Sequence, residues 1–234
     1  MTPTASAPAP EDPPRGAARS PRSGYAKGRA RQTAIIRTAA EYFAHKGFSA
    51  ATILDIAAAC GISRAGLLHY FPDKEALLQA VLEDRDTEDR ERFRPYARIP
   101  DGLGVLRGMV DLAQHNQLVP GLIELFVRLS AEASDPDHPA RPYFAARYAR
   151  IQDGTALALR RAREAGHVRP AVDPVEAAVR LTALMDGLQA QWLLNRDIAM
   201  ADHVHTAVLE LLTPTGTRTF DALRLPPPPA PLEP

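Results

Sequence analysis

The segment that most constrains this chain is residues 52–71, TILDIAAACGISRAGLLHYF. Two short helices that cross at a steep angle need apolar inner faces and a small side chain where they touch. Ala57 is that small residue, Gly61 follows four residues later, and Leu67 comes six residues after the glycine. Glycine suits the turn because it adopts positive φ without strain. This spacing predicts a helix-turn-helix.

Hydroxyl side chains precede both short helices, which we expect over 53–59 and 64–70. Thr52 and Ser63 are favoured N-cap residues, and a capped helix N-terminus also attracts phosphate. The outward positions of the second helix are Arg64, Ala65, Gly66, Leu68 and His69. Small residues let the backbone approach base edges, and an arginine can bind guanine through two hydrogen bonds. Taken alone, the arginine equally fits a solvated surface position.

Helical spacing of apolar residues extends over the rest of the chain, and sustained period-two alternation is absent from the sequence. Besides the two short helices, the pattern predicts helices over 27–46, 74–92, 102–117, 121–133, 140–165, 174–195 and 200–212. Gly47 supplies a stop for the first of them, and Pro95 falls in a gap after the 74–92 helix. We expect an all-α protein of about nine helices.

Proline is concentrated at the two ends of the chain. Six of the 22 prolines lie in residues 1–21 and seven in residues 214–234. We expect residues 1–24 to form a disordered tail and residues 214–234 to form a Pro-rich tail. The folded part then divides into a three-helix domain over 25–72 and a larger helical domain over 73–213.

Composition excludes a disordered chain, a collagen-like fibre and a disulfide scaffold as descriptions of the whole chain. The apolar fraction of 45% and the charged fraction of 24% match an ordinary globular domain. A single cysteine, Cys60, cannot form an internal disulfide; we interpret it as a small buried residue, with a redox sensor as the alternative. No stretch approaches the roughly 18 apolar residues of a membrane helix, so we expect a cytoplasmic protein without a membrane partner.

The formal net charge of zero conceals a basic N-terminal end. Residues 1–75 carry ten Lys and Arg against six Asp and Glu. Arg22, Lys27, Arg29 and Arg31 lie ahead of or early in the first helix. They could enter a minor groove as a disordered arm, or remain near phosphates without a fixed contact. We favour the second interpretation.

Residues 39–82 resemble the tetracycline-repressor (TetR) family of bacterial regulators. The likeness includes Gly47 followed by Phe48, the run Gly61-Ile62-Ser63, and Phe71 followed by Lys74-Glu75-x-Leu77. The resemblance implies an N-terminal three-helix DNA-binding domain, a fourth helix that links it to an effector-binding helical domain, and a homodimer. It also implies double-stranded operator DNA as a partner.

The same resemblance implies roles for individual residues. Thr52, His69, Tyr70 and Lys74 resemble the family's phosphate contacts, and residues 63–67, Ser63 to Leu67, resemble its groove-facing segment. With Arg29 and Arg31, these residues form the expected DNA-binding set. Leu68 stands where the family often has tyrosine, so we expect His69 and Tyr70 to take over that phosphate contact.

Residues 184–195 resemble the helix that dimerises proteins of this family. An apolar stripe runs along that helix, and a second one follows in the last predicted helix. The expected dimer interface is Leu181, Leu184, Leu188, Val204, Val208 and Leu211. Ala183, Gly187 and Ala190 form a thinner stripe of small residues on the first helix. The alternative is that these stripes are core of the monomer.

We expect a ligand pocket among the helices of residues 102–165. Its candidate lining is Met109, Leu112, His115, Phe126, Leu129, Phe144, Tyr148 and Ile151, with Trp192 at the floor or wall. Such stripes also occur in ordinary cores. A mostly apolar lining would suit a hydrophobic or aromatic small molecule as the unknown effector.

Enzyme motifs are weak in this sequence. Gly61-x-Ser63-x-x-Gly66 misses the hydrolase nucleophile elbow by one residue, and we expect no strand before it. His203-x-His205 and residues 135–138 lack further metal ligands, so we expect no metal and no cofactor. We therefore predict a DNA-binding repressor released by a small apolar effector. The alternatives are a DNA-binding regulator without such an effector, and an all-helical enzyme.

Overall fold

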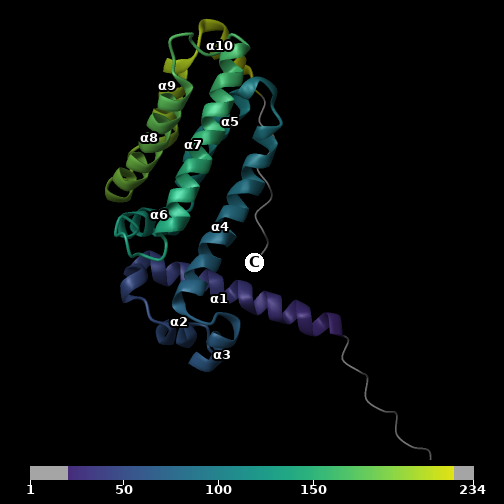
Figure 1. The fold of residues 1–234 in the computed structure, drawn as a ribbon, viewed down its shortest axis with the longest axis vertical. Coiled ribbons are helices and arrows are strands. Elements are labelled where there is room, and N and C mark those ends of the chain that lie inside the picture. Colours follow the sequence, from purple (N-terminus) through teal and green to yellow (C-terminus); the bar gives the residue numbers. More distant parts are fainter. Residues whose placement is uncertain (1–20, 224–234) are drawn as a thin grey trace, which may run out of the picture.

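The computed structural model describes residues 21–223, with side chains from residue 27 onward, and this part of the chain is helical nearly throughout (Figure 1). The helices are α1 (Pro21–Ala50), α2 (Ile53–Ala59), α3 (Arg64–Tyr70), α4 (Lys74–Ala97), the short η1 (Pro100–Gly102), α5 (Leu103–Asn116), α6 (Pro120–Glu132), α7 (Arg141–Glu164), α8 (Pro174–Leu194), α9 (Met200–Leu211) and α10 (Pro214–Ala222). An isolated bridge joins Val168 to Leu212. The expected all-α class is confirmed.

The helix-turn-helix has the bounds that its sequence predicts, since α2 and α3 begin and end where expected. Gly61 in the turn has φ of +64°. Ala57 is 1% exposed, which leaves room for the second helix to pass close by. Thr52 and Ser63 each accept a backbone N–H three residues later, at 3.1 and 3.0 Å. The steric pattern and the caps therefore determine this motif locally.

The first half of α4 belongs to the same packing unit as α1, α2 and α3. The buried cluster of this end contains Ile35, Ala39 and Phe43 of α1, Ile56 and Ala57 of α2, Leu67 of α3, and Leu77, Leu78, Val81 and Leu82 of α4. Burying such side chains contributes roughly 1.5–3 kcal/mol each. The start of α4 is therefore held firmly to the helix-turn-helix.

A contact from α6 holds the junction between α1 and α2. Gly47 interrupts the helical backbone of α1 with φ of +78°, as its sequence position predicts. The backbone N–H of Phe48 donates to Glu132 Oε2 of α6 at 2.9 Å, and the Phe48 ring meets the His138 ring edge-on. The N-terminal unit is thus tied to the rest of the molecule through α6 as well as through α4.

Long helices α4, α5, α7, α8 and α9 form the body of the molecule, with α10 at the end opposite α3 (Figure 1). Their buried cluster includes Leu106 of α5, Leu159 of α7, Ala178 of α8 and Val208 of α9. Within the described residues, every helix is too short or too polar to cross a membrane.

Three element bounds differ markedly from the sequence prediction. α4 continues through Pro95 to Ala97, whereas we expected a gap at that proline. The start of the expected Pro-rich tail is wrong, because residues 214–222 form α10. Thr213 caps this helix, and Phe220 inserts into the core with no exposed surface. At the other end, residues 21–24 of the expected disordered tail over 1–24 belong to α1, so that boundary is wrong as well. Residues 1–20 and 224–234 lie outside the described range.

Four residues of the expected dimer interface lie inside the subunit instead. Leu181, Leu188, Val204 and Val208 are at most 6% exposed and pack in the core of the body. Their assignment to an interface is wrong, because helices α5 and α7 already cover this stripe; the core alternative holds for them. Leu184 and Leu211 are half-buried and retain some open surface.

Candidate DNA-binding surface and ligand pocket

Helix α3 presents a polar face at the tip of the molecule. Arg64, Ala65 and His69 are exposed, and Gly66 is half-buried. The first turn of α3 carries no acidic side chain. An N-terminal helix end with an adjacent arginine is electrostatically suited to a polyanion, and the small residues allow close approach. The geometry of this surface fits insertion into a major groove.

Leu67 does not belong to that surface. Its side chain has no exposed area and packs in the cluster shared by α1, α2 and α4. Its placement among the groove-facing residues is therefore wrong, while the steric prediction that it closes the inner face of the helix is confirmed. The family resemblance assigns a role to five consecutive residues, but consecutive side chains on a helix point in different directions. One of the five therefore faces the interior.

The expected phosphate contacts lie around this face. Thr52 is exposed, although its hydroxyl oxygen already caps α2. Tyr70 is half-buried, and its ring packs edge-on against the ring of His69, with centroids 5.7 Å apart. Both residues stay accessible to a duplex, and their contact with phosphate stays a prediction.

Lys74 has a structural role that its sequence position did not reveal. Its ammonium group donates to the carbonyl oxygens of Phe48, Ser49 and Ala51 at 2.9, 3.4 and 3.2 Å. The same group lies 4.3 Å from the centre of the Phe48 ring. Lys74 thereby fastens the end of α1 and the adjoining Ala51 to the start of α4, in addition to the phosphate contact that we predict for it.

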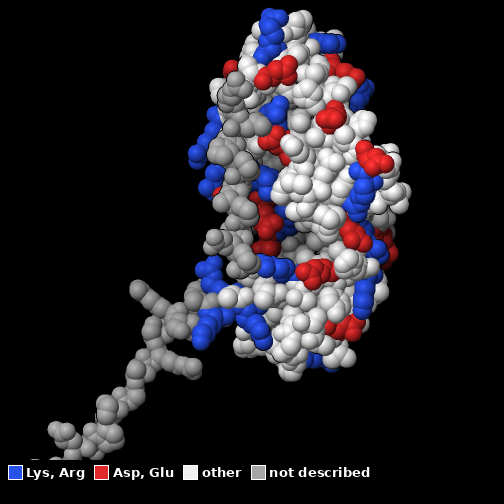
Figure 2. Space-filling model, turned by 180° about the vertical axis from the view of Figure 1, so that it is seen from behind, with Lys and Arg blue, Asp and Glu red and all other residues white. Residues whose placement is uncertain are grey.

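The basic run at the N-terminus lies on α1 and not on an extended arm. Lys27, Arg29 and Arg31 are exposed on this helix. In Figure 2, Lys and Arg side chains gather along this part of the molecule, at the lower left of the view. The backbone of Arg22 is helical, and its side chain lies outside the described range. The helix supplies positive charge close to the α3 end.

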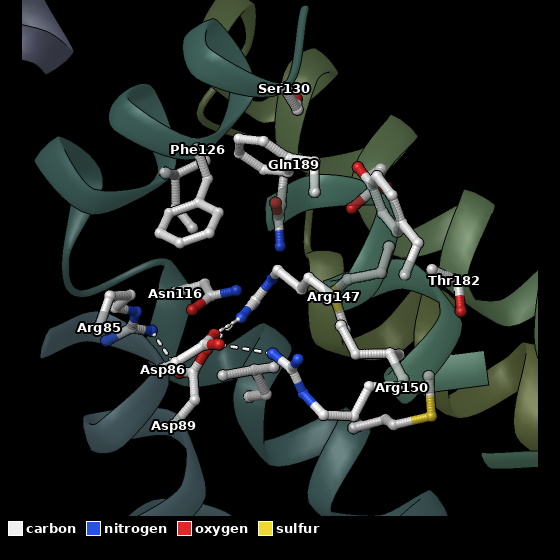
Figure 3. A pocket seen from close by; sticks show the side chains of 18 of the residues that line it. Arg85, Asp86, Asp89, Asn116, Phe126, Ser130, Arg147, Arg150, Thr182 and Gln189 are labelled. Carbon is white, nitrogen blue, oxygen red and sulfur yellow. Dashed lines mark hydrogen bonds and ion pairs between the residues drawn. The ribbon is translucent and has the colours of Figure 1, made fainter. Parts of the chain in front are cut away.

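A cavity of about 640 Å³ lies between α4, α5, α6, α7 and α8 (Figure 3). Six of the nine expected residues line it: Met109, Leu112, Phe126, Phe144, Tyr148 and Ile151. Its size is that of a small-molecule site. The helical spacing of the apolar residues therefore indicated both the place of the cavity and most of its apolar wall.

The other three expected residues are absent from its lining. His115 points to Arg92 instead, with Nε2 and Nη2 2.9 Å apart, and burial together with Arg92 lowers the pKa of His115. Leu129 is fully buried in the cluster of the N-terminal unit. Trp192 is buried in the body core, with the guanidinium of Arg196 3.8 Å from its ring centre. These three assignments are wrong because each side chain faces another neighbour.

One end of the cavity is strongly charged, which the expectation of a mostly apolar lining did not include. Asp86 of α4 accepts from Arg147 and Arg150 of α7, both at 2.5 Å, and Asp89 accepts from Arg147 at 3.0 Å. Arg85 pairs with Asp89 at 2.8 Å. We call these five residues the α4–α7 ion-pair cluster. The alternating charges of residues 83–92 were the available signal, but their partners lie 58 to 64 residues away.

Uncharged and weakly paired polar groups complete the lining. Asn116 is 3% exposed, and its amide oxygen lacks a hydrogen-bond partner among the described residues. Burial raises the pKa of Asp186, and burial and this carboxylate together raise the pKa of Tyr148 to about 12. Figure 3 shows Asn116 beside Arg147 and the amide of Gln189 directed toward the same guanidinium. The cavity combines an apolar chamber with a polar end.

The remaining sequence candidates have local explanations. His203 is exposed, and His205 Nε2 lies 3.7 Å from Asp221. Asp135 accepts the backbone N–H of Asp137 in a turn. Among the described residues, no group of three or more His, Cys, Asp or Glu side chains could hold a metal ion. Cys60 is a half-buried free thiol at the end of α2.

A helix-turn-helix at one end of the molecule, joined by the long helix α4 to a larger helical body, is the arrangement of a DNA-binding regulator. Residues 35–81 match the family described as bacterial regulatory proteins, tetR family, and residues 104–215 match the BetI-type transcriptional repressor C-terminal domain. The chain is 30% identical over 168 residues to the HTH-type transcriptional repressor Rv1474c of Mycobacterium tuberculosis. That match covers 72% of this chain and 85% of the relative.

This chain belongs to the TetR family of DNA-binding transcriptional regulators. Solved structures share its fold. A TetR transcriptional regulator from Chloroflexus aurantiacus matches with a TM-score of 0.69 and 22% identity, over 80% of this chain and 98% of that one. A candidate regulator from Saccharomonospora viridis in complex with choline matches with a TM-score of 0.69 and 24% identity, over 80% and 99%. The family consists of regulators, which leaves the enzyme alternative without support.

Proposed function

We propose that this protein represses transcription as a homodimer that binds two inverted DNA half-sites and releases them when a small molecule occupies the cavity. The observation that carries the proposal is the path of α4. Its first turns pack against α1, and Leu77 and Leu78 lie in the same buried cluster as Leu67 of α3. Its second half supplies Arg85, Asp86 and Asp89 to the cavity wall. A change at the cavity can therefore reach α3, the proposed recognition helix, through α4 and the cluster that it shares with α1, α2 and α3.

A modest energy suffices for such a switch. Effector coupling of roughly 1–3 kcal/mol changes affinity by about 5- to 150-fold. A ligand that moves α4 relative to α7 misplaces both recognition helices of a dimer, whose half-sites lie about 34–36 Å apart or a multiple of that distance. Small displacements at the pocket are enough, because the two helices must enter the groove together.

The outer face of α8 supports the dimer. Val175 and Val179 are 59% and 44% exposed, one helical turn apart. Ala183 is exposed on the following turn and Leu194, near the end of the helix, is 90% exposed. Apolar and small side chains in a row on one helix favour helix-to-helix contact between subunits. This face replaces the buried stripe of Leu181 and Leu188 as the proposed interface.

Selection from a pool of random-sequence duplexes tests the DNA-binding part of the proposal. The full-length protein should enrich an inverted repeat with a fixed spacing between half-sites. Enrichment of single half-sites only, or an unenriched pool at low salt, would overturn it. The enriched duplex then serves as the operator in every later measurement, so that no knowledge of the natural target is required.

Sedimentation of a charged variant tests the dimer. Val179→Glu should give a monomer and lower the affinity for the selected duplex by at least tenfold, because one half-site alone remains. Arg160→Glu, an exposed change on α7, is the matched control and should sediment as wild type. A Val179→Glu variant that stays dimeric would show that the interface lies elsewhere.

A further inference from the structure

The cavity has a chemically divided lining. Its chamber is built from Met109, Leu112, Phe126 and Ile151, all apolar. The α4–α7 ion-pair cluster occupies one end (Figure 3). A wholly apolar molecule would leave that end without a partner, whereas an amphipathic molecule would use both parts.

The charges at the polar end favour an anion. The described lining contains four arginines, Arg85, Arg90, Arg147 and Arg150, against three aspartates, Asp86, Asp89 and Asp186. Burial raises the pKa of Asp186, against the opposing effects of a hydrogen bond with Tyr148 and the charge of Arg147, so burial disfavours the negative charge of this carboxyl. A guanidinium group can bind one carboxylate through two parallel hydrogen bonds. Arg147 instead divides its two bonds, with Nη1 on Asp86 and Nη2 on Asp89, so both of its donors are directed at carboxylate oxygens.

Asp86 occupies the two arginines to which an anionic ligand would bind. Its side chain is 10% exposed and accepts from Arg147, Arg150 and the hydroxyl of Tyr143, the last at 2.8 Å. A carboxylate arriving from the chamber can take over the two arginines, because it presents the same pair of oxygens. Such an exchange keeps the largely buried Arg147 and the exposed Arg150 paired, and it leaves Asp86 with the hydroxyl of Tyr143 as its donor.

A second observation points to a ligand at the same place. Asn116 is buried and lies beside Arg147 in Figure 3, and within residues 21–223 its amide oxygen has no hydrogen-bond partner. A buried amide group without a hydrogen-bond partner is energetically unfavourable, so a ligand that supplies a partner gains from it. In Figure 3 the amide nitrogen of Asn116 is directed toward the Arg147 guanidinium, so Asn116 can donate to a carboxylate that binds there without any rotation of the amide.

We propose that the cavity binds an amphipathic carboxylate, whose apolar body fills the chamber and whose head displaces Asp86 from Arg147 and Arg150. The inference rests on the proposed function only for the consequence in DNA binding: loss of the two Asp86–arginine pairs loosens α4 from α7, which stay joined through Tyr143. The ligand and these two ion pairs are then mutually exclusive. An effector acts by replacing one partner of an ion pair.

Three matched probes test the head group on the full-length wild-type protein in the absence of DNA: 4-phenylbutyrate, 4-phenylbutanol and 4-phenylbutylamine. Calorimetric titration should show that the acid binds at least tenfold more tightly than the alcohol, and that the amine binds most weakly. An amine or an alcohol that binds as tightly as the acid, or a cavity that takes none of the three, would overturn the proposal.

Two variants that break the same ion pair should act in opposite directions. Asp86→Asn removes the competitor and should tighten binding of 4-phenylbutyrate several-fold, whereas Arg147→Gln removes the receptor and should weaken it about tenfold. Arg160→Gln, exposed on the same helix and away from the cavity, is the control. The acid-to-alcohol affinity ratio within each variant cancels any general loss of packing. Shifts of that ratio in the same direction would contradict the exchange.

Failure of this inference and failure of the proposed function are distinguishable. The probe titrations contain no DNA, so they report the cavity alone. The duplex selection contains no probe, so it reports the α3 face alone. If the protein prefers the acid but enriches no duplex, the inference about the cavity stands and the proposed repressor function is wrong.

Discussion

The two ends of this molecule distribute charge in opposite ways. In the unit formed by α1, α2, α3 and the start of α4, apolar side chains fill the interior and Arg64 lies outside. At the cavity, charged side chains such as Asp86 and Arg147 lie inside the fold. The first arrangement gives a rigid surface for a polyanion. The second holds buried ion pairs, which stabilise little but can be exchanged for a ligand.

The largest effect should come from the rigid end. Leu67→Ala should lower the free energy of unfolding by about 2–5 kcal/mol, because a fully buried leucine leaves a cavity. Urea denaturation followed by circular dichroism measures this loss. Leu68→Ala, at a half-buried position next to it, should cost much less. Equal losses for the two variants would mean that Leu67 faces outward after all.

The next largest loss of stability is expected at Gly216, where the backbone of α10 lies close to the carbonyl group of His167. A Cβ at Gly216 of α10 would lie 2.1 Å from the carbonyl oxygen of His167, so Gly216→Ala should cost about 1–3 kcal/mol. Gly121→Ala in α6 meets nothing within 4 Å and should be neutral or slightly stabilising. Thermal melting compares them. A neutral Gly216→Ala would show that α10 does not pack as described.

In the unit formed by α1, α2, α3 and the start of α4, Lys74 has two roles: it stabilises the fold, and we predict that it contacts DNA phosphate. Lys74→Met removes the donor to three backbone carbonyls and should lower the free energy of unfolding by about 1 kcal/mol. It should also weaken binding to all duplexes alike, because a phosphate contact carries no base preference. Denaturation and fluorescence anisotropy measure the two effects. An unchanged stability would contradict the structural role of Lys74.

The smallest effect concerns the buried carboxyl of the cavity. Because burial raises the pKa of Asp186, its ionised form destabilises the fold; stability from this group is highest below its unfolded pKa and is lost as the pH rises through the folded one. Asp186→Asn should therefore raise the melting temperature at pH 7 and lose this advantage in acid. A gain that persists unchanged at low pH would point to packing instead of charge.

Sequence reasoning succeeded where neighbours along the chain determine the structure. Ala57, Gly61 and the caps Thr52 and Ser63 lie within twelve residues of one another, and α2 and α3 have the predicted bounds. The apolar stripes likewise located most of the cavity wall. Each of these signals is read from spacing alone.

It failed where distant segments determine the outcome. Asp86 meets Arg147 across 61 residues, and no local pattern indicates that pairing. Leu181 and Val208 were expected at a dimer interface because they belong to apolar stripes. The sequence does not show whether such a stripe is covered by a second subunit or by another helix of the same chain. α10 was missed because Pro214 and the prolines near it suggested a tail, although Phe220 anchors the segment in the core.

The central claim is that the exposed face of α3 reads DNA sequence, and Arg64 tests it most directly. Fluorescence anisotropy with the selected duplex should show that Arg64→Ala weakens binding by about 1–3 kcal/mol and relaxes the preference at one base pair of each half-site. The free energy of unfolding should be unchanged, since Arg64 is exposed. An Arg64→Ala variant that binds the duplex with wild-type affinity and selectivity would contradict the account.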